Sequence, residues 1–106
     1  MSTIRDLTED DLNIILEWRN HPSIRQAMIN QHIISPSEHR DWFKSIQLSE
    51  KSFPLIYEEN GLSVGYVIFN LIDDSNNADW GFYSAPDAPK GTGLRMAKAA
   101  LDYAFH

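Results

Sequence analysis

Residues 53–72 read "FPLIYEENGLSVGYVIFNLI" and predict two strands joined by a tight turn. Asn60-Gly61 lies between the two apolar runs, and this dipeptide is the strongest short-range signal for a β-hairpin because it accepts the positive φ angles of such turns. Residues 76–85, "NNADWGFYSA", predict a third strand rich in aromatic side chains. Gly81 in its middle suggests a bulge or a close backbone approach. Three consecutive strands therefore form the centre of the chain.

The residues after the third strand predict a loop and then a helix. Pro86 and Pro89 end the strand, and the run "APKGTGLRMAKAALDYAFH", residues 88–106, becomes helical near Thr92 or Gly93. Apolar residues occupy a wide part of this helix, with Leu94, Ala97, Leu101 and Ala104 on one side and Met96, Ala100 and Phe105 beside them. We expect more apolar surface here than the preceding strands cover.

The residues before the hairpin predict a short strand and two helices. Residues 2–6 suit the strand. Thr8 and Asp11 have the spacing of an acidic capping box, and the helix that they open should end near Pro22. Ser35 is an N-cap with Pro36 and Glu38 behind it, and the helix it opens should bury Trp42, Phe43, Ile46 and Leu48. The connector, residues 23–34, has no strong hydrophobic periodicity. A connector of this length inside a compact domain more often has a function than serves only as a link.

The element order β-α-α-β-β-β-α predicts one α/β (α+β layered) domain over residues 1–106. The net charge of −6 disfavours nucleic acid as a partner, because a phosphate-backbone binder needs a basic stripe. No apolar run approaches membrane-spanning length and the first residues have no apolar signal region, so we expect a soluble, cytoplasmic protein without a membrane partner. There is no cysteine, and the histidines lack metal-ligand spacing, so no metal site is expected.

The loop Lys90-Gly91-Thr92-Gly93 is the first candidate for a binding site. It begins a G-x-G-x-x-G pattern, but Met96 stands where the third glycine would be, and no complete P-loop is present. Glycine-flanked amides at a helix N-terminus can still bind an anion. Lys90, Arg95 and Lys98 form the only basic cluster of the sequence, which suits one small anionic ligand. An ordinary strand-to-helix turn explains the loop equally well.

The side chains of the remaining candidates also have two interpretations each. Arg19 is a helix-end cation that could instead reach a phosphate or a sugar hydroxyl. Trp42 and Trp80 are core or half-core residues that could wall a ligand pocket, because tryptophan combines apolar area with one donor. Met28 lies in the connector, where a flexible apolar contact is as plausible as a place in the core.

The sequence resembles about the first two thirds of the GNAT acetyltransferase fold. The loop Ala88-Pro89-Lys90-Gly91-Thr92-Gly93 is similar to the family pattern [Q/R]-x-x-G-x-[G/A], although Ala88 replaces the opening Gln or Arg. The combination of "LEWRNHPSIRQAM", "IISPSEHRDWF" and "WGFY…PKGTG" is more specific. It resembles the PseH/FlmH branch, the nucleotide-sugar N-acetyltransferases of pseudaminic acid biosynthesis and flagellin glycosylation. The resemblance covers essentially all 106 residues.

The resemblance implies transfer of an acetyl group from acetyl-CoA, with no metal, to the 4-amino group of a UDP-linked 4-amino-4,6-dideoxy sugar. Lys90, Gly91, Thr92 and Gly93 would hold the CoA pyrophosphate, and Arg95 would add charge. Phe82 and Tyr83 lie on the strand that would pair with the pantetheine amides and stabilise the thioester oxyanion. Five residues would bind the nucleotide sugar: Arg19 and His39 as polar contacts, and Met28, Trp42 and Trp80 as walls.

The resemblance also implies that residues 1–106 are a partial GNAT domain. Such a domain continues with a fifth strand, a fourth helix and two further strands, and its proton-transfer groups lie there, so the catalytic residues are expected beyond His106. A sheet that ends before its fifth strand has an unpaired edge, and we expect this edge to favour a homodimer.

Two other functions stay open. The acceptor could be a protein N-terminus or a polyamine, as in Rim-like relatives, although "WRNHP" and "SPSEHRDWF" favour the sugar. The chain could also be a non-catalytic binding or assembly module derived from a GNAT domain.

Overall fold

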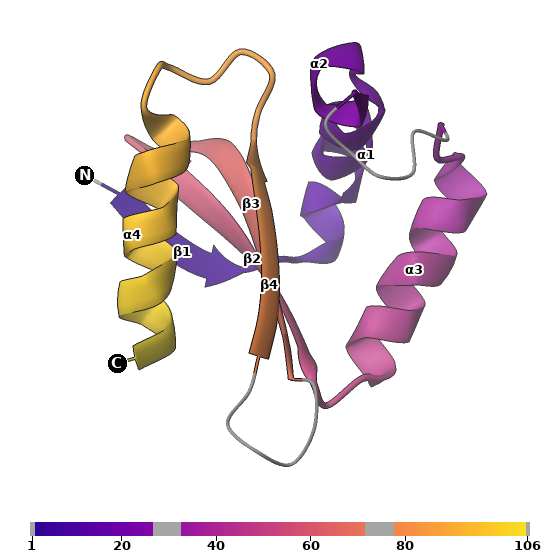
Figure 1. Ribbon diagram of the computed structural model, residues 1–106. Coiled ribbons are helices and arrows are strands. Elements are labelled where there is room, and N and C mark those ends of the chain that lie inside the picture. The colour runs from indigo at the N-terminus through magenta and orange to yellow at the C-terminus, as the bar shows by residue number, and fades with distance from the viewer. Residues whose placement is uncertain (1, 27–32, 72–77, 106) are drawn as a thin grey trace. The chain divides into compact units, whose positions relative to one another are not determined.

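The computed structural model describes residues 2–26, 33–71 and 78–105 (Figure 1). The chain divides into two compact units. The first comprises residues 1–7 and 51–106, and the second comprises Thr8–Glu50. The sheet and the last helix belong to the first unit, whereas the second is helical.

The first unit contains an antiparallel sheet, in the order β1-β2-β3-β4. Its strands are β1 (Ser2–Asp6), β2 (Ser52–Glu59), β3 (Leu62–Leu71) and β4 (Ala78–Ser84). The predicted hairpin is confirmed, because Asn60 and Gly61 join β2 to β3 with φ angles of 54° and 81°. Both residues of the turn therefore have positive φ, as a two-residue hairpin loop demands.

The prediction of a bulge or close backbone approach at Gly81 is wrong. Gly81 pairs with Ile68 in an unbroken register, and a Cβ built on it would meet nothing within 4 Å. The irregularity lies between β2 and β3 instead, where Tyr57 pairs with Gly65 and Glu58 with Ser63. The close approach also occurs at a different glycine, because the Met96 side chain lies against Gly65.

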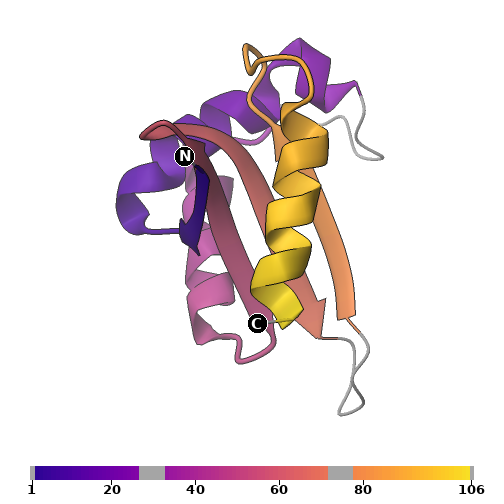
Figure 2. The same cartoon turned by 90° about the vertical axis from the view of Figure 1, so that its left-hand side faces the viewer.

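Helix α4 (Thr92–Phe105) begins where predicted and lies along one face of the sheet (Figure 2). The buried residues of this interface form one cluster: Leu55, Tyr57, Val67, Met96 and Ala100. Met96 and Ala100 are four residues apart, so they occupy the same helix face. The expected excess of apolar surface is confirmed, since Leu94 and Leu101 are 67% and 44% exposed.

The second unit contains a 3₁₀ turn η1 (Glu9–Asp11) and three helices: α1 (Leu12–Asn20), α2 (Pro22–Arg25) and α3 (Pro36–Leu48). Both predicted capping boxes are present, at Thr8 and at Ser35. The Asn20 side chain fixes the entry to α3, because it donates to the Ile34 carbonyl at 2.8 Å and accepts from the Ile34 amide at 2.7 Å.

Two details of the second unit differ from the predictions. The connector begins with the short helix α2, whose first residue is Pro22 and whose N-cap is His21. Proline favours the first turn of a helix, and its fixed φ therefore starts α2 immediately after α1 ends. On α3, Phe43 is buried, but Leu48 is 86% exposed. The buried residues His39 and Phe43 are four apart, and Leu48, the last residue of the helix, does not continue that spacing.

Across the described ranges, no helix is long and apolar enough to cross a membrane. The same residues contain no cluster of three or more histidine, aspartate or glutamate side chains that could hold a metal ion.

Candidate functional site

The loop between β4 and α4 is built from two consecutive turns. The Ala88 amide donates to the Ala85 carbonyl at 3.0 Å, and the Thr92 amide donates to the Pro89 carbonyl at 3.1 Å. Gly91 lies inside the second turn with φ of +87°, a conformation that L side chains rarely adopt. The chain therefore turns sharply into α4 at a position that requires glycine.

Three backbone amides of this loop and first turn have no acceptor among the residues that the structure describes. They belong to Gly91, Gly93 and Leu94. The first amides of a helix lack intrahelical partners and carry the positive end of the helix dipole. Gly91 is also exposed, and neither glycine has a side chain that would block an approaching group. Amides of this kind can bind an anion such as phosphate.

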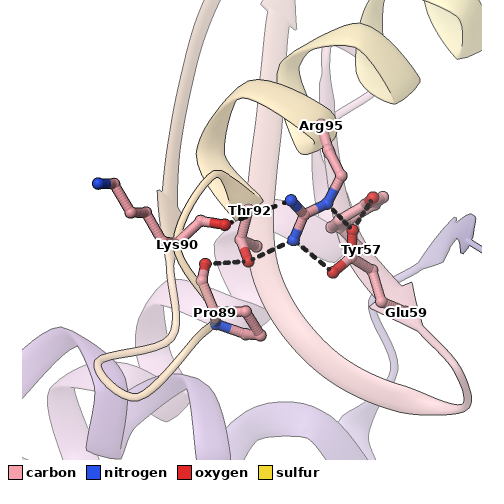
Figure 3. Close-up of polar contacts among 6 residues, drawn as sticks. All are labelled: Tyr57, Glu59, Pro89, Lys90, Thr92 and Arg95. Carbon is pink, nitrogen blue, oxygen red and sulfur yellow. Dashed lines mark hydrogen bonds and ion pairs between the residues drawn. The ribbon is translucent and has the colours of Figure 1, made fainter.

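Arg95 connects this loop to the sheet (Figure 3). Its Nε and Nη2 atoms donate to the two carboxylate oxygens of Glu59, at 2.6 and 3.0 Å. Nη2 also donates to the Thr92 hydroxyl at 3.1 Å, and Nη1 donates to the Lys90 carbonyl at 3.3 Å. Tyr57 donates its hydroxyl to Glu59 at 2.6 Å. The end of β2, the loop and the start of α4 thus share one network of hydrogen bonds.

Sequence reasoning missed Tyr57 and Glu59. Residues two apart on a strand share a face, so both side chains lie on the α4 side of the sheet. Their alternation was visible in the sequence, but their partner Arg95 is 36 residues further along the chain, and no local pattern indicates that pairing.

The Arg95 guanidinium, followed by the hydrogen bond from Tyr57, lowers the pKa of Glu59 from its ordinary value of 4.5 to about 2. Glu59 in turn raises the pKa of Arg95. Burial, followed by the hydrogen bond to Glu59, raises the pKa of Tyr57. At neutral pH the network therefore contains a carboxylate, a guanidinium and a neutral phenol.

We expect the Glu59 carboxylate to stabilise the fold only where it is ionised. Because its pKa is lower in the folded chain, its contribution is complete above about pH 4.5 and disappears as the pH falls toward about 2. This contribution equals the difference in free energy of unfolding between the wild type and Glu59→Gln, measured by thermal unfolding at several pH values from 7 to 2. The difference should shrink between pH 4.5 and 2. A difference that stays constant over that range would contradict the assignment.

An open pocket of about 650 Å³ adjoins the network in the first unit. Its lining includes polar and charged side chains from the sheet and from α4: Ser2, Tyr57, Glu59, Asn60, Arg95, Lys98 and Asp102. The lining contains both positive and negative groups. The network therefore has one side against the loop and another side accessible to solvent.

Strand β4 holds the predicted Phe82, Tyr83 and Trp80 on two different faces of the sheet. Trp80 packs against the cluster beneath α4 and stacks on Phe69 and Phe82, with ring centroids 5.7 and 5.0 Å apart. Tyr83 stacks on Tyr66 at 5.1 Å. Among the described strands, β4 has a neighbour on one side only, so its outer edge is available to an extended ligand.

Three of the predicted sugar-binding residues lie in the second unit: Arg19 on α1, and His39 and Trp42 on α3. The His39 ring stacks on Trp42 at 5.2 Å, and its Nε2–H donates to the Leu12 carbonyl at 3.0 Å. Burial lowers the pKa of His39, which favours the neutral ring at neutral pH. Met28 lies outside the described residues, so its predicted role has no structural account.

The loop that opens α4 and the outer edge of β4, which no described strand covers, agree with the family to which the sequence belongs. Residues 2–106 match the acetyltransferase (GNAT) domain family, and the chain is a member of it. It is 29% identical to acetyltransferase PseH of Campylobacter jejuni serotype O:2 and 28% identical to PseH of serotype O:23/36. Each match covers 99% of this chain and 65% of the relative, so the chain spans less than two thirds of their length.

Solved acetyltransferase structures have the same fold. An aminoglycoside acetyltransferase AAC(6′)-Ib in complex with coenzyme A superimposes with a TM-score of 0.81 at 20% identity, over 99% of this chain and 68% of that one. Spermidine N-acetyltransferase from Vibrio cholerae, in complex with CoA and spermine, superimposes with a TM-score of 0.82 at 22% identity, over 98% and 63%. At these identities the likeness establishes the fold alone.

Proposed function

We propose that this chain binds acetyl-CoA and belongs to an N-acetyltransferase. The observation that carries the proposal is the set of amides at Gly91, Gly93 and Leu94, which have no acceptor within residues 2–26, 33–71 and 78–105, in a chain that matches the GNAT family over residues 2–106. These amides would bind the pyrophosphate, and the exposed Lys90 would add charge. Acetyl-CoA would supply an activated acetyl group as a thioester. The outer edge of β4 at Phe82 and Tyr83 would pair with the pantetheine amides.

We propose the 4-amino group of a UDP-linked 4-amino-4,6-dideoxy sugar as the acceptor. The matches to two PseH proteins support this choice, together with the Arg19 and His39 segments of the second unit. The enzyme would then act in pseudaminic acid biosynthesis for flagellin glycosylation, in the cytoplasm. A polyamine or a protein N-terminus is the alternative acceptor, and a non-catalytic module is the alternative function.

The first test is binding of CoA by calorimetry, made on the protein produced to the natural stop codon of its gene. Binding of CoA supports the proposal, and a failure to bind would reject it. The second test offers [¹⁴C]acetyl-CoA with the UDP-4-amino sugar, spermidine or an N-terminal peptide. Label on the sugar alone supports the acceptor, label on another substrate replaces it, and CoA binding without any transfer favours the module.

Arg19→Ala tests the sugar site. We expect this substitution to raise the KM for the sugar nucleotide about tenfold, on the order expected for one charge-assisted contact, and to leave the KM for acetyl-CoA nearly unchanged. Arg40→Ala is the matched control, because Arg40 is an exposed arginine of α3. If both KM values rise together, Arg19 supports the helix rather than the substrate.

A homodimer of the unliganded protein through the outer edge of β4 is also a prediction, because a partner strand would occupy the same edge that we propose for pantetheine. Two antiparallel β4 strands could pair along the edge that the described strands leave open. Light scattering of the purified protein measures this, and a monomer at micromolar concentration would reject it.

A further inference from the structure

We propose that Arg95 and Glu59 are positioning residues, which hold the loop 89–93 in the orientation that binds phosphate, and that Arg95 is not itself a phosphate ligand. This inference rests on the proposed CoA site and changes the role that the sequence suggested for Arg95. It follows from the contacts of the guanidinium, from the geometry of the peptide bonds it holds and from the position of Gly91.

The Arg95 guanidinium is largely used by the protein. An arginine side chain has five N–H donors in a planar fork. Four of the five are used in hydrogen bonds, of which two go to Glu59, one to the Thr92 hydroxyl and one to the Lys90 carbonyl. The paired carboxylate also neutralises the charge. Releasing Arg95 to bind a phosphate would require breaking a bidentate ion pair, which is among the stronger hydrogen-bonded contacts.

The two carbonyls held by this network determine where the neighbouring amides point. In a trans peptide the C=O and the following N–H point in opposite directions. The Lys90 carbonyl accepts from Arg95, so the Gly91 N–H must point away from the guanidinium. The Pro89 carbonyl accepts from the Thr92 hydroxyl at 2.6 Å, and this hydroxyl accepts from Arg95. A chain of hydrogen bonds therefore runs from Glu59 to the peptide bonds on both sides of Lys90, and the second of them carries the Gly91 amide proposed to bind phosphate.

Gly91 allows this arrangement for a second reason besides its φ angle. A Cβ at residue 91 would lie 3.0 Å from Nη1 of Arg95, the atom that donates to the Lys90 carbonyl. A side chain there would push the guanidinium away from the loop. The Lys90 ammonium, by contrast, extends away from the network in Figure 3 and stays available to a ligand.

The sign of the Glu59→Gln effect on CoA affinity separates the two roles of Arg95. If Arg95 positions the loop, removing the carboxylate loosens the loop and CoA should bind about tenfold more weakly. If Arg95 is a phosphate ligand, the same change frees it and removes a nearby negative charge, so CoA should bind as tightly or more tightly. Arg95→Lys should also lose affinity, because one ammonium cannot make the four contacts, whereas a lysine would serve as a direct phosphate ligand.

Glu58→Gln is the matched control for this substitution. Glu58 is the next residue of β2, lies on the opposite face of the sheet and pairs with Arg5 at 3.3 Å. The charge change is identical, so a general electrostatic effect would appear in both variants. We expect only Glu59→Gln to weaken CoA binding. Pantetheine, which lacks the pyrophosphate, should bind to the wild type and to Glu59→Gln equally.

Amide hydrogen exchange of the unliganded protein provides a second readout that does not depend on CoA. In Glu59→Gln, we expect faster exchange at Thr92 and Arg95, whose amides donate to the Pro89 and Gly91 carbonyls, and unchanged exchange in β3. If the wild type fails to bind CoA, the proposed function is rejected. Hydrogen exchange in the unliganded protein still tests whether Arg95 and Glu59 hold the loop. Unchanged exchange at Thr92 and Arg95, equal acceleration across the sheet, or tighter CoA binding by Glu59→Gln would each overturn the positioning role.

Discussion

Met96→Ala should lower the free energy of unfolding by about 2–5 kcal/mol, because it removes a fully buried side chain from the centre of the first unit. Met96 is 0% exposed and belongs to the cluster with Leu55, Tyr57 and Val67, which joins α4 to the sheet. The remaining side chains belong to β2, β3 and α4 itself, and they cannot close the cavity without moving the helix or the sheet. Urea unfolding monitored by circular dichroism measures the loss.

Leu94→Ala is the control, because it removes the same number of non-hydrogen atoms from the same helix at a site that is 67% exposed. Its effect should stay within about 0.5 kcal/mol. Gly65 supplies a stricter test, since a Cβ there would overlap the Met96 sulfur. Gly65→Ala should destabilise the wild type but cost less, or nothing, in the Met96→Ala background, where the methyl group occupies the cavity. Additive effects of the two substitutions would contradict this packing.

Gly91→Ala should weaken CoA binding about tenfold or more. Alanine at φ of +87° costs about 1–2 kcal/mol of backbone strain, and its Cβ would also lie 3.0 Å from the Arg95 guanidinium. The loop would relieve both by moving, and the amides proposed to bind phosphate would lose their alignment. Calorimetric titration with CoA gives the change in Kd.

Gly61→Ala separates strain from the contact with Arg95. Gly61 has a φ of +81°, almost that of Gly91, but its Cβ would meet nothing within 4 Å. Gly61→Ala should therefore lose the free energy of backbone strain alone and Gly91→Ala at least as much, whereas only Gly91→Ala should lose CoA affinity. If Gly91→Ala binds CoA as tightly as Gly61→Ala and the wild type do, the conformation of the 89–93 loop is unimportant for binding.

Local chemistry in the sequence predicted most of the elements. The Asn60-Gly61 turn, the capping boxes at Thr8 and Ser35, and the helix start at Thr92 depend on residues a few positions apart, and the structure confirms each of them. The glycine loop was also recognisable, because the φ preference of glycine and the unpaired amides of a helix start are local properties.

Contacts between distant residues were decided only by the tertiary structure. Gly65 and Gly81 both lie within strands. Their sequence neighbours do not show that Met96 packs against Gly65, or that nothing packs against Gly81. Likewise, the sequence suggested Arg95 as a phosphate ligand, and only the tertiary structure shows that Glu59 of β2 is its ion-pair partner. The sequence determined which segments turn, pair or coil and where an anion could bind, because those depend on near neighbours. The tertiary structure determined which charged side chains form ion pairs. Arg95 and Glu59 are 36 residues apart, and they meet only because α4 packs against the sheet.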